Sequence, residues 1–558
     1  MPSAVWAEAA RCHRILYDTA RRAELPLFAM LWCGRMHPST HSLRAIAAPV
    51  LLAVAAAAQG TFSLDRAEPG TLGSNFQFAY AGTTPGLLVL AASFTPGSTP
   101  LTPPISNRPL DIGPALVTFL EPAVGTFGLT TPIAIPNNAG LGGMTLHWQA
   151  VTMPGTNLLL DQISNRVVTQ LATPFSAWAL PATSVGRAWA ATIHRGAAQG
   201  PGTFLFAGGA LRPTISSEPT DTSSTFDPRT FEIGVGPLLP EDVYGMATTR
   251  IATTGAYLLT GGIGTPPGNP PPPQAVTSGC ALYDPIGNTF TATQPMSTPR
   301  FLHAAASLPD GRVVVVGGSG SIDLTSPRPL SSCEVFNPAT QTWAPGPSLP
   351  LPRAFGVLST LPNGELLLHG GLEFLGPIPF HATSCLRLVS GAGGQLSWRA
   401  EAPISSRHVA HEQGTLLLAD GRLLVAGGTE FRIQGTTLDL FAINRVDIYD
   451  PNTATWSPAS AAPSTGFFAG TLTQLPNGLV IAAGGLAGPL GNNASAQPLR
   501  DVMAFDPSTG LWQTMPPMQQ PRFLHAAVGT ADGLVVVVGG HFAGQGGGEN
   551  TVVETIRM

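Results

Sequence analysis

A glycine pair that ends a short apolar run recurs seven times along the 558-residue chain. The first glycines of these pairs are Gly208, Gly261, Gly317, Gly370, Gly427, Gly484 and Gly539. Successive pairs lie 53 to 57 residues apart. Self-similarity at a fixed period of about 50 residues, with four short strands in each unit, predicts a ring of repeated β-sheet blades.

Two further landmarks keep register with the glycine pairs. Asp-Gly or Asn-Gly precedes most pairs, as at Asp310-Gly311, and tolerates the positive φ angles of a tight hairpin turn. An aromatic residue before Asp-Pro or Asn-Pro follows most pairs, as at Tyr449-Asp450-Pro451, and a second aromatic residue, here Trp456, comes soon after. The first turn therefore joins strands one and two of each blade, and the proline turn joins strands three and four.

These landmarks resemble the kelch motif over roughly residues 174–558. The resemblance implies a seven-bladed kelch-type β-propeller, over residues 171–558, and says little about activity because one fold hosts many functions. After Gly539 only the run 551–557 reads as a strand, so blade seven lacks its fourth strand. We expect the segment around 175–180, which contains Trp178, to supply it and so remove an exposed strand edge.

The segment 59–170 shows short apolar runs broken by Pro and Gly, with no helical periodicity that lasts ten residues. The whole chain carries only 11% charged residues, with 64 Gly and 55 Pro, which suits an all-β protein with many turns. We expect a small antiparallel β-sandwich-like domain here. A carbohydrate- or surface-binding role and a purely structural spacer are both open for it.

The N-terminal region predicts export. Residues 36–58 contain Arg44, an apolar stretch and the small-residue run Ala56-Ala57-Ala58, which together read as a signal peptide. Residues 1–35 read as a misassigned extension, with translation starting at Met36. The apolar stretch is too short for a membrane span. We therefore expect a secreted, extracellular or cell-surface monomer with no membrane span in the mature chain.

The charge balance argues against nucleic acid or an anionic membrane as the partner. No lysine is present, and residues 59–558 hold 21 Arg and 29 acidic residues, a net charge of −8. A net negative chain without a basic run does not attract polyanions. The expected partner is an extracellular protein or glycan.

Basic residues recur where strand one of several blades begins, and they are the candidate ligand-binding residues. They are Arg300, His303, Arg353, Arg407, His411, Arg522 and His525. One hypothesis is a ring at the mouth of the central channel that binds an anionic or hydroxyl-rich ligand, or a metal. The alternative is that each Arg bonds to carbonyl groups of its own blade. His303 and His525 belong to blades that are not neighbours, so no shared metal site, no catalytic residue and no cofactor is predicted.

The connections between strands two and three are long, whereas the turns on the opposite face are short. Length asymmetry of this kind marks the face that carries function in a scaffold fold. We call this side the long-loop face and expect it to carry binding.

Cysteines outside the leader occupy one repeated position. Cys280, Cys333 and Cys385 each lie three residues before the strand-three landmark, where blades five and six have Val. We interpret them as buried apolar residues without a disulfide, because equivalent positions in adjacent blades lie too far apart to be bridged.

The resemblance also raises the galactose oxidase branch of kelch-type propellers, whose copper is held by two His and two Tyr, one Tyr being linked to a Cys. Tyr283 and Tyr449 are strand-three landmarks, and only Tyr244 starts a strand one, without a Cys beside it. This copper site is therefore not expected. Three functions stay open: a recognition or scaffold protein, a cryptic oxidase, lyase or hydrolase acting on carbohydrate at the channel mouth, and a structural surface component.

Overall fold

The computed structural model describes the chain between Ser63 and Arg557 in segments. The stretches left out between these limits are 67–74, 82–85, 95, 100–109, 113–116, 124–126, 131, 136–143, 155–161, 165, 171–175, 181–189, 196–202, 211–217, 229, 266–272, 324–327, 377, 435–436, 463–465, 491–495, 531–532 and 542–552. The expected signal peptide and N-terminal extension lie outside the described residues.

Antiparallel sheets make up the part before residue 171. One sheet has the order β1-β3-β8, with β1 at Ser63–Arg66, β3 at Phe78–Ala81 and β8 at Phe127–Leu129. A second has the order β11-β10-β4-β7, with β12 also paired to β10. These strands are β4 (Gly86–Ser93), β7 (Val117–Ala123), β10 (Thr145–Pro154), β11 (Gln162–Ile163) and β12 (Val167–Gln170). Two short pairs, β2–β9 (Asn75–Phe76 and Ile133–Ala134) and β5–β6 (Pro96–Thr99 and Leu110–Ile112), complete the part.

Side chains of both larger sheets meet in one apolar core. Leu64 and Phe78 from the first sheet pack with Leu88 and Trp148 from the second. Alternation along each strand turns one face of each sheet toward this core. The arrangement agrees with the expected sandwich-like domain.

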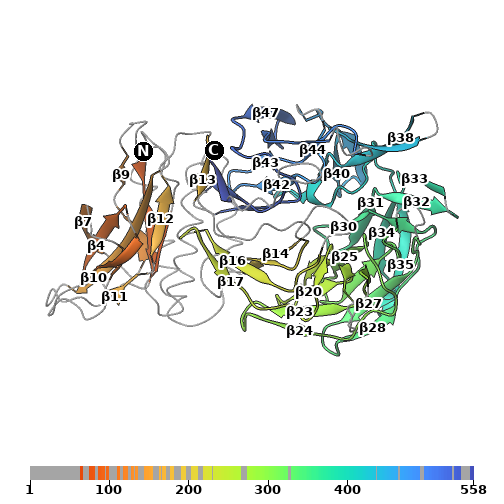
Figure 1. The fold of residues 1–558 in the computed structure, drawn as a ribbon, viewed down its shortest axis with the longest axis horizontal. Helices are drawn as coiled ribbons and strands as arrows, with labels where there is room; N and C mark the ends of the chain where they lie inside the picture. Colours follow the sequence, from red (N-terminus) through yellow and green to blue (C-terminus); the bar gives the residue numbers. More distant parts are fainter. Residues whose placement is uncertain are drawn as a thin grey trace. The chain divides into compact units, whose positions relative to one another are not determined.

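Seven four-stranded antiparallel sheets follow, and we number these blades in chain order (Figure 1). Blades one to three are β14-β15-β16-β17 (Ala191–Arg195, Thr203–Ala207, Ser223–Asp227, Glu232–Val235), β19-β20-β23-β24 (Ala247–Arg250, Tyr257–Thr260, Cys280–Asp284, Thr289–Ala292) and β25-β26-β27-β28 (Ala304–Ser307, Val313–Val316, Cys333–Asn337, Thr342–Pro345). Blades four and five are β30-β31-β34-β35 (Val357–Thr360, Leu366–His369, Cys385–Ser390, Leu396–Glu401) and β36-β37-β40-β41 (Thr415–Leu417, Leu423–Ala426, Val446–Asp450, Thr455–Pro458). Blades six and seven are β42-β43-β46-β47 (Thr471–Gln474, Val480–Ala483, Val502–Asp506, Leu511–Met515) and β48-β49-β50-β13 (Ala526–Gly529, Leu534–Val538, Val553–Arg557, Ser176–Leu180).

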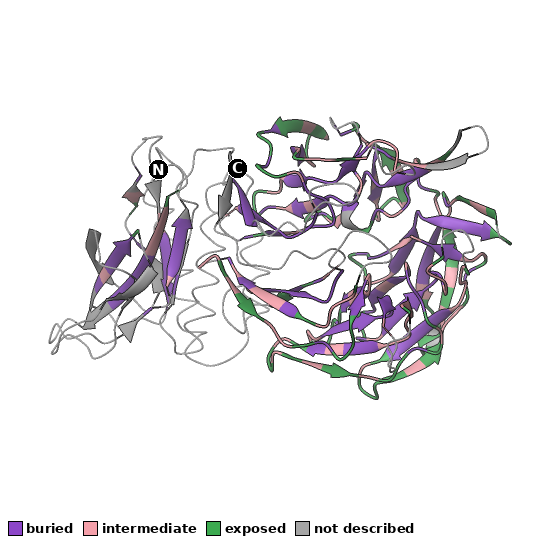
Figure 2. Cartoon of the chain, viewed as in Figure 1, coloured by how far each residue is buried: buried purple, intermediate pink, exposed green. Residues whose placement is uncertain are grey.

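The apolar runs before the glycine pairs are the second strands, and they lie at the centre of the cores. Val313–Val316 is buried at all four positions, as is Leu366–His369 (Figure 2). A strand that is buried on both faces has apolar residues at consecutive positions of its sequence. The neighbouring blades bury the two faces of each second strand, since an apolar cluster joins each blade to the next.

The ring closes as the sequence predicts. Strand β13 pairs antiparallel with β50, with Trp178 opposite Thr555. Phe204 and Phe206 of blade one pack in the same cluster as Val536 and Val553 of blade seven. The segment before blade one is therefore the outermost strand of blade seven, and no four-stranded sheet of the described residues is left without a neighbour on either side.

Several of the long connections form further strands rather than irregular loops. The strands are β18-β21-β22 (Val243–Tyr244, Ile263–Gly264, Ala275–Val276), β29-β32-β33 (Arg353–Ala354, Leu372–Leu375, Ile378–His381), β38-β39 (Thr429–Gln434, Thr437–Ala442) and β44-β45 (Leu486–Ala487, Gln497–Pro498). Two 3-10 turns, Ala392–Gly394 and Glu412–Gly414, are the helical elements of the described residues. No helix there is long and apolar enough to cross a membrane.

Candidate functional site

A backbone hydrogen bond defines one equivalent position in successive blades. The second glycine of each pair donates its N–H to a carbonyl of the segment that enters the next blade. The accepting residues are Val243, Arg300, Arg353, His408, Phe467 and Arg522. We call this the entry position. Its side chain points into the blade that follows it, toward the second residue of strand three.

Arg300 and Arg522 hold the entry positions of blades three and seven and are fully buried. Arg300 donates to Glu334, at 2.7 Å, and to the carbonyl of Gly317, at 2.8 Å. Arg522 makes the same pair of bonds in blade seven, to Glu554 at 2.6 Å and to the carbonyl of Gly539. These guanidinium groups are therefore directed into their own blades rather than into the channel.

The two glutamates also accept hydrogen bonds from the backbone that precedes each arginine. Glu334 accepts hydrogen bonds from the backbone N–H groups of Ser297 and Thr298. Glu554 accepts the equivalent bonds from Gln519 and Gln520. A buried carboxylate satisfied in this way stays ionised, and the pKa of Glu334 is lowered by these bonds and by Arg300 in spite of its burial.

Blade four keeps the arginine but changes the source of the acid. The second residue of its third strand is Leu386, so Arg353 pairs instead with Glu373 of β32. It also donates to the carbonyl of Ser384, at 3.0 Å. The β32–β33 hairpin of blade four therefore supplies the carboxylate that pairs with the arginine at the entry position.

Blade five shifts the expected register by one residue. His408, not Arg407, occupies the entry position, and its Nε2 lies 2.8 Å from Oδ2 of the buried Asp447. Its Nδ1 lies 2.7 Å from the carbonyl of Gly427, where Arg300 contacts Gly317 in blade three. The placement of Arg407 at the start of strand one was wrong: it lies one residue earlier, is exposed, and forms no ion pair with the described residues.

Blades two and six fill the entry position with apolar pairs. Phe467 packs in one cluster with Met503, which stands where blade three has Glu334. Val243 occurs with Ala281 at the corresponding positions of blade two. In these two blades both residues of the pair are apolar, because a buried charge without a partner would be costly.

The residue two positions after the entry position has a left-handed backbone conformation in blades three to seven. Leu302, Phe355, Ala410, Ala469 and Leu524 all have positive φ, between 51° and 59°. Backbone N–H groups join neighbours in this set: Phe355 donates to Leu302, Ala410 to Phe355, and Leu524 to Ala469. Such strained conformations persist where the surroundings enforce them. These residues thus link neighbouring blades through the backbone, two positions after the entry positions.

His303, His411 and His525 lie three residues after the entry positions of blades three, five and seven and are buried. Their Nε2 atoms lie 3.0 to 3.1 Å from Thr260, His369 and Thr471 of the preceding blade. Burial, aided by Arg300 or Arg522, lowers the pKa of His303 and of His525 to about 3, so these rings are neutral. In the described residues no group of three or more His, Cys, Asp or Glu is placed to hold a metal ion.

Two hairpins of adjacent blades are linked on the long-loop face. The backbone N–H of Phe431, in β38 of blade five, donates to Nε2 of His381, in β33 of blade four, at 2.8 Å. Leu372 and Phe374 on the His381 face of the β32–β33 hairpin pack with Val409 of blade five. The other face carries Leu375, Ile378 and Phe380, which are 68%, 64% and 40% exposed.

A charge cluster lies beside this link. Glu430 accepts from both Arg432, through Oε1, and Arg445, through Oε2 at 2.8 Å. The guanidinium of Arg432 also lies over the ring of Phe441, 4.6 Å from its centroid. Burial is the main cause that lowers the pKa of His381. The charges of Arg407 and Arg445 lower it further, and the charge of Glu430 raises it. Of these residues only Arg407 was among the candidates; His381, Glu430, Arg432 and Arg445 were missed because they were assigned to no repeated position in the sequence.

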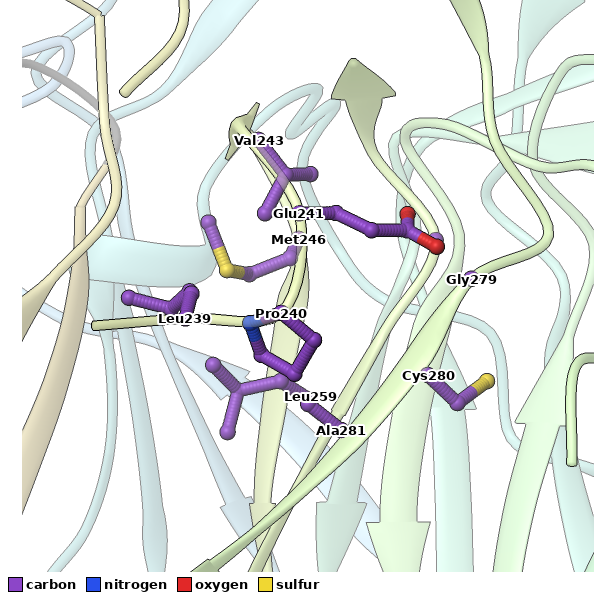
Figure 3. A pocket seen from close by; sticks show the side chains of 10 residues that line it. Leu239, Pro240, Glu241, Val243, Met246, Leu259, Gly279, Cys280 and Ala281 are labelled. Carbon is purple, nitrogen blue, oxygen red and sulfur yellow. The ribbon is translucent and has the colours of Figure 1, made fainter. Parts of the chain in front are cut away.

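A small pocket opens between the segment that follows blade one and the strands of blade two (Figure 3). Leu239, Val243 and Met246 line it, and Glu241 turns its carboxylate toward Gly279 (Figure 3). Cys280 lies at one side, and burial raises the pKa of its thiol to about 12. Cys333 and Cys385 are free and buried in the same way, with pKa values also raised to about 12, as expected for structural cysteines.

Comparison with known proteins agrees with this repeat structure. The kelch motif family model matches residues 300–350, which span blade three, and 475–519, which contain strands two to four of blade six. The chain is a kelch-repeat β-propeller. Kelch-like protein 33 from Homo sapiens is 29% identical over 226 residues, covering 38% of each chain. Kelch-like protein terF from Aspergillus terreus is 26% identical over 270 residues, which are 48% of this chain and 55% of that protein.

This kelch propeller thus aligns with about two fifths to one half of the length of those curated relatives. Among solved structures, a fungal alcohol oxidase of the AA5 family in complex with copper covers 68% of the chain at 17% identity, with a TM-score of 0.48. The structure of YjhT covers 60% at 16% identity, with a TM-score of 0.44. Ligand binding by the seven candidate residues stays a prediction.

Proposed function

We propose that this kelch propeller is a secreted or cell-surface recognition protein that holds a protein partner on its long-loop face. Kelch repeats suggest a protein-binding scaffold. Export rests on the signal-peptide pattern of residues 36–58. The proposal includes glycans as the second class of ligand for the same face.

One observation supports this reading above the others: the β32–β33 hairpin of blade four presents an apolar face to solvent. Leu375, Ile378 and Phe380 share that face because Leu375 pairs across the strands with Ile378, and Phe380 with Glu373. Contiguous exposed apolar side chains mark interaction surfaces in soluble proteins. Pro379 in the edge strand β33 lacks an N–H, so side chains rather than added strand pairing would carry the contact.

The alternative, a carbohydrate-active enzyme at the channel mouth, would need reactive groups there. Of the residues expected at the mouth, Arg300 and Arg353 are buried in ion pairs inside their blades, and His303 is buried against Thr260. The geometry therefore favours recognition.

A photo-crosslinking amino acid at position 375 tests the proposal in cells that express the protein. Covalent adducts with a protein partner are expected from position 375. Ile286, 68% exposed in the turn between strands three and four on the opposite face, is the matched control site. Adducts of equal yield from positions 375 and 286 would refute the assignment of the face.

N-terminal sequencing of the exported protein tests the leader. The expected mature chain begins close to Gln59, after the small-residue run. A mature start upstream of Met36 would overturn both the assigned leader and the assigned start of translation.

A further inference from the structure

Among the described side chains beside the linked hairpins, the arginines outnumber the carboxylates. Arg432 and Arg445 share the single carboxylate of Glu430, and Arg407 is exposed without an ion pair among the described residues. Every buried arginine of the entry positions, in contrast, has a carboxylate of its own. The chain as a whole has a net charge of −5, so this excess is local.

His381 lies beside two of the three arginines, Arg407 and Arg445. Its imidazole is acted on by the charges of Arg407, Glu430 and Arg445, and its Nε2 accepts the N–H of Phe431. Because Nε2 is an acceptor, the ring is neutral and adds no charge of its own. Val409 forms an antiparallel bridge with Thr429, so Arg407 lies near Phe431, which bonds to His381. Arg445, just before β40, reaches the same region through its ion pair with Glu430.

We propose that Arg407 and Arg445, beside His381, form a binding site for the carboxylate of an acidic peptide segment in the partner protein. The proposal rests on the long-loop face being the recognition face. Guanidinium groups bind carboxylates through paired N–H donors, and Glu430 already shows Arg445 engaging one. A second carboxylate would lie on the Arg407 side, where none of the described residues supplies one.

The surroundings favour a peptide over a sugar acid. The ring of Phe441 is covered by the guanidinium of Arg432, and Phe431 packs against His381, with ring centroids 6.2 Å apart. Each of these two aromatic rings therefore already has a side-chain neighbour that a stacking sugar ring would meet. A flexible acidic side chain needs only the exposed guanidinium groups.

The test uses the full chain and a fluorescein-labelled oligoglutamate peptide, with oligoglutamine as the uncharged probe. Arg407→Gln is expected to weaken oligoglutamate binding at least ten-fold, and added salt to weaken it further. Arg328→Gln is the control, since Arg328 is an exposed arginine in the connection between strands two and three of blade three. Unchanged affinity in Arg407→Gln would overturn the site.

His381 supplies an independent readout by NMR of the histidine rings. A bound carboxylate near Arg407 offsets the positive charge that lowers the pKa of His381, so this pKa should rise on binding. His194 in blade one, which is exposed, should show no change. Oligoglutamate binding without movement of the His381 titration would place the peptide elsewhere and refute the proposal.

Two further outcomes separate the alternatives. Binding of polygalacturonate that depends on Arg407, with no binding of oligoglutamate, would refute the peptide and assign an acidic glycan. Adducts from position 375 together with no oligoglutamate binding would refute this site while the recognition face stands. If position 375 gives no adducts while oligoglutamate still binds, the assignment of the recognition face is refuted and the peptide site is not.

Discussion

Nε2 of His408 lies 2.8 Å from Oδ2 of Asp447, in the place where blades three and seven hold an arginine and a glutamate. One chain thus contains three versions of the same contact: Arg with Glu, His with Asp, and Phe467 with Met503. Each version matches charge to charge or apolar group to apolar group. The blades therefore provide natural replacements for one another, from which stability experiments can be designed.

Exchanging the pair of blade three for that of blade six tests this matching. Arg300→Phe alone leaves Glu334 buried without its cation, and should lower the free energy of unfolding by about 3–5 kcal/mol. The double variant Arg300→Phe, Glu334→Met should recover most of that loss. Urea unfolding of the single and double variants measures both values; a double variant less stable than the single one would contradict the matching.

Acid should destabilise the propeller through its buried histidines. The ordinary pKa of 6.5 falls to about 3 in folded His303 and His525, so between these values only the unfolded chain takes up the protons. Each ring then lowers the free energy of unfolding by up to about 1.4 kcal/mol per pH unit as the pH falls from 6.5 toward 3. His303→Met, which copies Met246 of blade two, should reduce that slope. The check is urea unfolding between pH 7.5 and pH 4.5, and an unchanged slope would exclude His303 as a contributor.

Tryptophans of the fourth strands tie blades three, four and six to the blade before. The indole Nε1 of Trp343 donates to the carbonyl of Gln294 at 2.8 Å, and Trp398 and Trp512 make the equivalent bonds. Trp343→Phe should cost about 1 kcal/mol of stability, because the ring packing is kept and one hydrogen bond is lost. Blade two already has Phe290 in this place, packed on Tyr283. Calorimetry should show a lowered Tm, and a Tm equal to that of the parent protein would show that the bond contributes nothing.

The three blade thiols should be inert until the protein unfolds. Burial raises the pKa of Cys280, Cys333 and Cys385 to about 12, so almost no thiolate is present at pH 8. A variant with Cys12→Ser and Cys33→Ser isolates their response to an aromatic disulfide reagent. Slow reaction in the native state and three thiols titrated in denaturant are expected. Fast native labelling of any one would show that its strand opens readily.

The blade structure could be predicted because many landmarks keep the same register. Gly-Gly, Asp-Gly and Asp-Pro recur together, so an error at one blade is corrected by the others, and the strand around Trp178 follows from the gap that this register leaves. The entry position in blade five could not be placed in this way. Arg407 and His408 are adjacent basic residues, and only the hydrogen bond from Gly371 shows which of them turns inward.

The candidate site was harder to predict because its residues lie outside the repeat. His381, Arg432 and Arg445 come together through two hairpins whose strands are local to blades four and five. The Gly-Pro step at 376–377 between apolar runs is a hairpin signal in the sequence, yet nothing there specifies that β33 would meet β38. The partners of the buried arginines were equally hidden, because Glu334 and Glu554 differ from the residues of the other blades at that position.

The pairing of β13 with β50 also sets an order of events in folding. The two strands stand at opposite ends of the propeller sequence, so the first cannot find its partner until the last residues of the chain have left the ribosome. A nascent chain then carries an unfinished ring throughout synthesis, with one open sheet at each end. If the protein is exported, as proposed above, in an unfolded form, ring closure at the final strand would delay completion of the fold until export is possible.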